Sequence, residues 1–178
     1  MTLVIDRVDA NDLQLLAEHQ ARHRAESGQD GFHFMPFAPG DDSGPRLRLA
    51  EGLERPLTEP GWERVFAAFT DHRAGIVGEV NLTGDSLRTG LHRCELGIGI
   101  EHSHRGQGLG RRLMQTAIDF VRAAEPLAWL DLKVFAHNHP ARALYRTLGF
   151  QEIGTVTDRF RIDGARIDDV MMTLDVRG

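Results

Sequence analysis

A chain of 178 residues, 41% hydrophobic and 26% charged, has the size and composition of one folded domain with a single core. Its formal net charge of −5 argues against a nucleic-acid-binding protein, and its one cysteine, Cys94, excludes an internal disulfide and a cysteine-rich zinc site. The sequence shows neither a signal peptide nor an apolar run of membrane-spanning length. We therefore expect a cytoplasmic protein with no nucleic-acid and no membrane partner.

The first part of the chain predicts a strand and two helices. Residues 3–8 are rich in β-branched side chains and predict a strand. In the helix that follows, one face is expected to hold the apolar residues Leu13, Leu16, Ala17 and Ala21. His19 and His23 have a spacing that suits a metal site, but a solvated helix face is the favoured interpretation. Residues 45–53 predict a second, short helix.

Residues 27–44 form a polar loop that contains large apolar side chains, namely Phe32, Phe34, Met35 and Phe37. Such side chains need an apolar environment. Two interpretations stay open: the side chains fold back onto the core, or they line a substrate pocket.

Three apolar, β-rich runs follow, at residues 62–70, 76–82 and 91–100, and they predict an antiparallel meander. In the third run, side chains alternate between two faces. Cys94, Leu96, Ile98 and Ile100 share one face, and Arg93, Glu95, Gly97 and Gly99 share the other. The two glycines would permit a bulge or the close approach of a ligand.

The rest of the chain predicts a helix from Leu109, a strand at 129–135, a second helix at 140–148, and strands at 150–156 and 166–176. A turn at Asp163-Gly164 separates the last two strands. No linker or repeat interrupts the chain, so we predict one mixed α+β domain that comprises residues 1–178.

A glycine-rich turn precedes the helix at Leu109. Its glycines let backbone N–H groups converge, the helix start adds partial positive charge, and Arg105 and Arg111 flank it, so a phosphate or pyrophosphate is the expected ligand. A dinucleotide fingerprint fails because Arg111 or His102 stands where its last glycine is needed. A P-loop fails because no lysine follows Gly110.

Two motifs resemble those of the GCN5-related N-acetyltransferases (GNAT family). Arg105-Gly-Gln-Gly-Leu-Gly110 is similar to the family's acetyl-CoA pyrophosphate loop. Asn138-His-Pro-Ala-Arg-Ala-Leu-Tyr145, followed by Gly149-Phe150, is similar to its second signature. The resemblance is strong from about Gly75 onward, and residues 158–172 look most like the ribosomal-protein and polyamine acetyltransferase branch.

The resemblance implies an acyl-CoA N-acyltransferase fold, with a central, mostly antiparallel, twisted sheet of about seven strands flanked by helices. The acetyl-CoA core would comprise residues 75–178, and the acceptor-side elements residues 10–60. The pantetheine arm would lie along the strand end and the pyrophosphate on the N–H groups of the turn. The expected cofactor contacts are Ile98, Gly99, Ile100, Arg105, Gly106, Gln107, Gly108, Leu109, Gly110, Arg111, Asn138 and Tyr145. The co-substrate is expected to be acetyl-CoA, without a metal.

Acetyl transfer to an amine needs a base, a stabilised oxyanion and an acid for the departing thiolate. Tyr145 matches the family's acid, and Asn138 matches a residue that binds the cofactor arm or orders water, with helix capping as the alternative. The positions that hold a base in relatives are occupied by Cys94, Leu96 and Lys133, none of which is a conventional base. Glu79 on the adjacent strand is the candidate base, with an ion-paired or surface carboxylate as the alternative, and Glu95 is expected on the side of its strand opposite Cys94.

We therefore predict an acetyl-CoA-dependent N-acetyltransferase that acts by direct attack of the amine, with a small-molecule amine, an amino acid or a protein N-terminus as acceptor. The acceptor site is expected to include Phe32, Phe34, Phe37, Glu79 and Asn81. A non-catalytic acyl-CoA-binding or regulatory module is the alternative, and Tyr145 and Asn138 argue against it. Transfer of a longer acyl group and assembly as a homodimer stay open.

Overall fold

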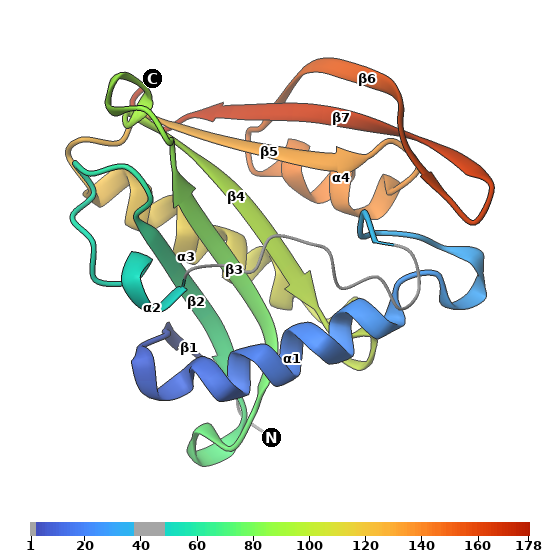
Figure 1. Cartoon of the computed structure of the whole chain (residues 1–178), viewed down its shortest axis with the longest axis horizontal. Coiled ribbons are helices and arrows are strands. Elements are labelled where there is room, and N and C mark those ends of the chain that lie inside the picture. Colours follow the sequence, from blue (N-terminus) through green and yellow to red (C-terminus); the bar gives the residue numbers. More distant parts are fainter. Residues whose placement is uncertain (1–2, 38–48) are drawn as a thin grey trace.

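The protein forms a seven-stranded sheet with helices on both faces (Figure 1). The structure is a computed structural model, and it describes residues 3–37 and 49–178. The strands are β1 (Val4–Arg7), β2 (Glu63–Phe69), β3 (Ile76–Gly84), β4 (Arg93–Ile100), β5 (Trp129–Phe135), β6 (Gln151–Ile162) and β7 (Ala165–Asp175), in the order β1-β2-β3-β4-β5-β7-β6. The helices are α1 (Leu13–Glu26), α2 (Leu49–Gly52), α3 (Leu109–Ala123) and α4 (His139–Thr147). The predicted α+β fold is confirmed.

The sheet is split in its middle. β4 and β5 are parallel and pair only from Arg93–Trp129 to Leu96–Leu132, whereas the other neighbouring strands are antiparallel. Beyond Leu96 the two strands fan apart toward Ile100 and Phe135 (Figure 1). Within residues 3–37 and 49–178, no strand pairs with these two facing edges. Backbone N–H and C=O groups there can therefore pair with a ligand, apart from the Ile100 carbonyl, which accepts from Arg105.

The face covered by α3 and α4 holds the larger core. On α3, Leu113, Ala117 and Val121 are fully buried there. Their spacing at i, i+4 and i+8 places them on one stripe of the helix. α3 lies close against β3 at Gly78, where an added Cβ would come 3.3 Å from side-chain atoms of Leu113. The rear helix is therefore fixed tightly against the split sheet.

The prediction for the inward face of α1 is confirmed for Leu13 and Leu16, which pack in the core, and wrong for the two alanines. Its buried stripe is Leu16, His19 and His23, whereas Ala17 and Ala21 are exposed. The solvated-face interpretation of the two histidines is therefore wrong as well. The alanines are too small to fill the space above the sheet, and the larger imidazole rings occupy it.

Turn positions follow the sequence more closely. The predicted turn at Asp163-Gly164 joins β6 and β7, and both residues have positive φ angles of 50° and 79°. The predicted helix at 45–53 corresponds to α2 at Leu49–Gly52, and residues 45–48 lie outside the described residues. Within the described residues, no helix has both the length and the apolar character needed to cross a membrane.

Candidate active site

The glycine-rich turn leads into α3 without a side-chain cap. Gly106 and Gly108 have φ angles of 71° and 81°, in the left-handed region that favours glycine. Gly108 is the N-cap residue of α3, and it has no side chain that could accept from the first-turn N–H groups. These donors, together with the helix dipole, suit an anion. The loop therefore fits the pyrophosphate that the sequence predicts.

Arg105 connects this loop to α1. Its Nε donates to the Ile100 carbonyl oxygen at 2.8 Å, and its Nη2 donates to Glu26 Oε2 at 3.0 Å. The guanidinium also lies over the Phe34 ring, 4.4 Å from its centre. Burial lowers the pKa of Arg105, and Glu26 offsets part of that effect. The charge of Arg105 is therefore already paired within the protein.

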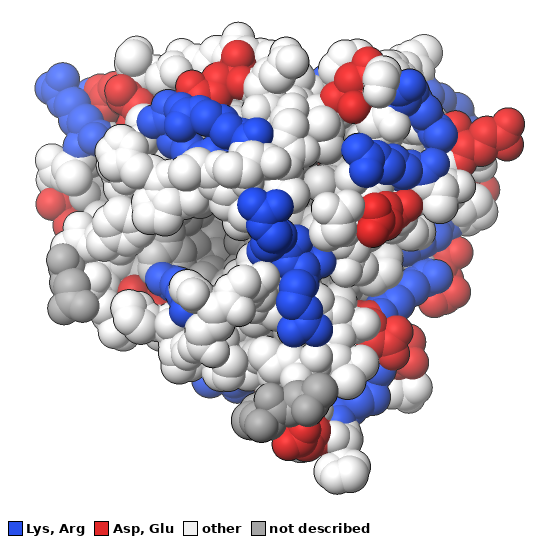
Figure 2. Space-filling model, turned by 180° about the vertical axis from the view of Figure 1, so that it is seen from behind, with Lys and Arg blue, Asp and Glu red and all other residues white. Residues whose placement is uncertain are grey.

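Arg111 is placed differently. It is exposed on the first turn of α3, and its Nη2 donates to Thr147 Oγ1 on α4 at 2.8 Å. Figure 2 shows a hollow on the face opposite to that of Figure 1, with Lys and Arg side chains beside it. Of the two arginines that flank the turn, Arg111 is the one whose guanidinium is not tied to a carboxylate within the described residues.

α4 packs beside the glycine-rich turn. An added Cβ at Gly110 would lie 3.2 Å from Leu144 Cδ2 and 3.3 Å from Ile100 Cδ1, so α3, α4 and the end of β4 meet there. The next residue, Tyr145, is buried with its ring 6.1 Å from that of Phe150. Burial raises the pKa of Tyr145 to about 12. The phenol therefore keeps its proton at neutral pH and can act as a donor.

Asn138 caps α4. Its side-chain oxygen accepts a hydrogen bond from the Ala141 N–H at 3.3 Å, which satisfies one of the first-turn donors. The capping role that the sequence left as an alternative is thus present. The amide nitrogen of Asn138 is not used by this bond, so a second role in binding the cofactor arm stays a prediction.

Gly97 and Gly99 make room for protein side chains. An added Cβ at Gly97 would lie 2.9 Å from Asn81 Oδ1, and one at Gly99 would lie 2.8 Å from His23 Cδ2. Asn81 and His23 therefore fill the space directly over these two glycines. Close approach of a ligand to Gly97, which also lines a cavity on this face, stays a prediction. Cofactor contact with the backbone edge of Ile98, Gly99 and Ile100 stays a prediction.

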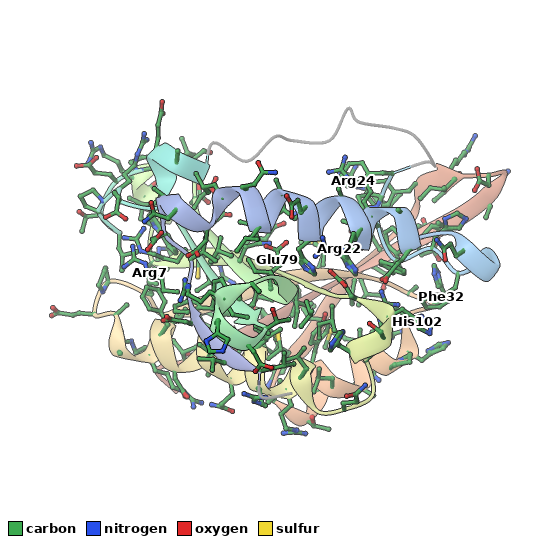
Figure 3. The ribbon with its side chains drawn as sticks, turned by 90° about the horizontal axis from the view of Figure 1, so that it is seen from below. Arg7, Arg22, Arg24, Phe32, Glu79 and His102 are labelled. Atoms are coloured by element: carbon green, nitrogen blue, oxygen red, sulfur yellow. The ribbon has the colours of Figure 1, made fainter. Side chains whose placement is uncertain are left out.

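Glu79 is buried beneath α1. Figure 3 shows it between α1 and the sheet, and only 6% of its surface is exposed. Gln20 Nε2 donates to both carboxylate oxygens, at 3.0 and 3.2 Å. Burial raises the pKa of Glu79 to about 7, and the Gln20 hydrogen bond opposes part of that rise. A carboxylate with such a pKa can accept a proton from an amine near neutral pH.

A cavity of about 900 Å³ opens on the same face of the sheet, between α2 and strands β3 and β4. Asn81, one of the predicted acceptor residues, lines it. The cavity reaches Leu96 and Gly97, where the pairing of β4 with β5 ends. Carboxylates dominate its charged lining: Glu51, Glu63, Asp85, Glu95 and Asp131.

Sequence reasoning missed most of this acidic lining. Glu63 pairs with Thr83, Thr83 with Glu95, and Glu95 with Asp131, so one row of directly opposite residues crosses four strands. Glu95 lies on the side of β4 opposite Cys94 as expected, and that side is the cavity side. Glu79 and Asn81 lie on the same face of the sheet, where Asn81 lines the cavity and Glu79 lies outside its lining. Strand alternation places each residue on a face, but the register between strands is needed to form the row.

The aromatic loop lies at the other end of this face. Phe34 stacks on His23 at 4.9 Å, and Phe32 meets His137 edge-on at 5.2 Å. His23 covers the end of β4, and His137 follows β5, so these rings bridge the diverging strand ends. None of Phe32, Phe34 and Phe37 lines the 900 Å³ cavity. Their role in acceptor binding stays a prediction.

Cys94 faces the opposite side of β4 from the acidic row. Its thiol is buried, and burial raises its pKa to about 12. The thiolate required of a nucleophile is therefore strongly disfavoured. This agrees with a packing role and not with an acetyl-enzyme.

A mixed sheet split between parallel strands, with an uncapped glycine loop beside the split, defines an acyl-CoA N-acyltransferase architecture. An acetyltransferase of the GNAT family from Streptococcus pneumoniae superposes with a TM-score of 0.83 and 25% identity, covering 98% of this chain and 99% of that one. A putative acetyltransferase from Salmonella typhimurium, solved with its cofactor acetyl-CoA, superposes with a TM-score of 0.77 at 19% identity, covering 99% of this chain and 95% of that one.

Sequence comparison identifies the family. Residues 33–150 match the model of the Acetyltransferase (GNAT) family, and the chain belongs to that family of acetyl-CoA-dependent N-acetyltransferases. It is 27% identical to [Ribosomal protein uS5]-alanine N-acetyltransferase from Escherichia coli, over 97% of this chain and 87% of that relative. It is 38% identical to N-alpha-acetyltransferase RimI from Mycobacterium tuberculosis over 68 residues, which span 38% of this chain and 40% of that relative.

Proposed function

We propose that the protein transfers the acetyl group of acetyl-CoA to a primary amine by direct attack, with a peptide N-terminus or a small-molecule amine as acceptor. One observation carries this proposal: the acceptor cavity and the opening of the sheet meet at Leu96 and Gly97. An amine that enters along the cavity would reach the split from one face, while the glycine loop and α4 hold the donor from the other. The names of the relatives favour a peptide N-terminus.

The residues supply the two proton transfers. Acetyl-CoA, when bound, provides an activated acetyl group. Glu79 accepts a proton from the ammonium form of the acceptor, directly or through water, because its raised pKa suits that exchange. The free amine adds to the thioester carbonyl and forms the new C–N bond, and the C–S bond breaks as the tetrahedral intermediate collapses. The Tyr145 hydroxyl gives its proton to the departing sulfur, and the proton that the acetylated nitrogen loses returns through water to the Tyr145 oxygen. Glu79 releases its proton to solvent. Backbone N–H groups near Ile98 to Ile100 stabilise the oxyanion.

The experiment measures release of free CoA over a panel of amines and short peptides. With an accepted amine, Tyr145→Phe is expected to lower kcat by ~100-fold or more, since the proton donor is lost. Acetyl-CoA binding by calorimetry should stay close to wild type. Glu79→Gln is expected to lower kcat/KM similarly and to remove its rise with pH near pH 7.

Cys94→Ser is the matched control, because it changes a buried residue of the central strand that has no assigned role in the reaction. It should retain turnover. Tight acetyl-CoA binding with no turnover on any amine would instead support a non-catalytic module. Full activity of Tyr145→Phe would show that the acid has been misassigned.

A further inference from the structure

Glu63 is a buried carboxylate at the edge of the acceptor cavity, and its Oε2 has no partner among the described residues. Only 9% of its surface is exposed, and the described part of the chain offers its buried Oε2 no hydrogen-bond donor. The side chain lies against α2, where an added Cβ at Gly52 would come 2.9 Å from Glu63 Cγ. Burying such a group without a partner is costly, so its presence calls for an explanation.

The other carboxylates of the cavity floor already have cations. Arg93 Nη2 lies 2.6 Å from Asp131 Oδ1, and Lys133 Nζ lies 2.8 Å from Glu95 Oε2. For Glu63 no ion pair is found among the described residues. Asp85 also lines the cavity and has no ion pair within the described part of the chain, but it is exposed to solvent. Glu63 is therefore the buried carboxylate of the cavity that has no cation among the described residues.

The strand register gives the distance between Glu63 and Gly97, where the proposed reaction takes place. Glu63 lies opposite Thr83, and Gly97 lies opposite Asn81, so the two are two strands and two residues apart. With strands roughly 5 Å apart and residues rising roughly 3.3 Å each, this places Glu63 about 12 Å from Gly97, backbone to backbone. The Glu63 side chain spans part of that distance.

We propose that Glu63 forms a second-cation subsite, which binds an ammonium or guanidinium group that the acceptor carries in addition to the amine that is acetylated. This inference rests on the proposed function, since it takes the cavity as the acceptor site. Burial raises the pKa of Glu63 above its ordinary value, and a cation at this position favours the charged form. The preferred acceptors are thus diamines, or peptides with a basic residue close to the N-terminus.

Binding tests the subsite without requiring turnover. Calorimetry with the full chain would compare diaminopentane with pentylamine and diaminooctane with octylamine. We expect at least one diamine to bind ~10-fold or more tightly than its monoamine, which is typical of one hydrogen-bonded charge pair. The dipeptide amides Ala-Lys and Ala-Gln form a second arm, which distinguishes a peptide acceptor from a free diamine.

Glu63→Gln should remove the preference for the dication and leave monoamine binding unchanged. Glu51→Gln is the matched control, because Glu51 also lines the cavity but is exposed and already lies 3.9 Å from Arg55. It should keep the preference. A loss shared equally by both variants would indicate a general charge effect and overturn the proposal.

Equal binding of dications and monoamines by the wild type, in both arms, would also overturn the subsite, whether or not any variant folds. The proposed function fails separately, if no amine is acetylated while the preference for dications persists. Turnover of monoamines with no preference for dications would support the proposed function and overturn the Glu63 subsite.

Discussion

At the residue scale, Arg105 shows how a motif residue can act through position instead of charge. It is the first residue of the glycine motif, and its position alone indicates contact with phosphate. In the structure it joins the end of β4 to α1 through Ile100 and Glu26, with Phe34 beneath it. We infer that its main role is to hold the loop in the conformation that presents its N–H groups.

The variant Arg105→Lys distinguishes a positioning role of Arg105 from a role of its charge. Arg105→Lys keeps the charge but cannot make both bonds, so we expect the KM for acetyl-CoA to rise by ~5-fold or more. Glu26→Gln should have a similar effect, and the double variant should be no worse than either, because both remove one connection. Steady-state kinetics at saturating acceptor measures the effect.

Arg111→Lys provides the control for charge at the other side of the turn. Since Arg111 is exposed and bonds only to Thr147 among the described residues, its replacement should change KM little if backbone N–H groups hold the pyrophosphate. Wild-type kinetics in Arg105→Lys, combined with a large loss in Arg105→Gln, would show instead that Arg105 acts by charge.

At the element scale, α4 depends on its cap and also carries the proposed acid. Asn138 accepts from the Ala141 N–H, and Tyr145 lies two turns further along the same short helix. Replacing Asn138 can therefore lower activity in two ways. It can loosen the helix that positions Tyr145, or it can remove a contact between the Asn138 amide and the cofactor.

Asn138→Asp distinguishes these two effects, because aspartate caps helices as well as asparagine but cannot donate. We expect Asn138→Ala to lose about 1 kcal/mol in the free energy of unfolding, and Asn138→Asp to keep wild-type stability. Asn138→Asp should nevertheless raise the KM for acetyl-CoA by ~10-fold. Chemical unfolding and kinetics on the same preparations provide both values. Wild-type kinetics in Asn138→Asp would confine Asn138 to capping.

The elements also show where sequence reasoning succeeds. α3 was predictable because large apolar residues recur at helical spacing, and the glycine loop because its constraint is local, in residues with positive φ. The buried face of α1 was predicted partly wrongly, because its alanines were taken as buried apolar residues and its histidines as solvated polar ones. His19 is buried because Glu101 Oε1 lies 2.9 Å from its Nδ1, a contact 82 residues away in sequence.

The acceptor side was the least predictable for the same reason. Glu79 and Asn81 were proposed as acceptor-side residues from one strand, whereas Glu63 reaches the cavity only through the pairing of β2 with β3. Strand register depends on the whole sheet, so no local pattern points to that residue.

At the scale of the whole molecule, two buried groups beneath α1 give the stability opposite dependences on pH. Burial raises the pKa of Glu79 to about 7, so its contribution is fully present below the ordinary value of 4.5 and is lost as pH rises through 7. Burial, followed by Arg105, lowers the pKa of His23 to about 4. Its contribution is fully present above 6.5 and is lost as pH falls through 4.

Removing each group should therefore tilt the stability profile in opposite directions. Relative to wild type, Glu79→Gln should gain stability as pH rises from about 4.5 to about 7, by an amount on the order of 3 kcal/mol. His23→Gln should lose stability relative to wild type as pH rises from about 4 to about 6.5. Urea unfolding across that range measures both differences, and each variant serves as the control for the other. If the two stability differences changed in the same direction with pH, at least one of the two groups would carry its charge in the folded protein. The inference that Glu79 and His23 are both buried in their neutral forms beneath α1 would then be wrong.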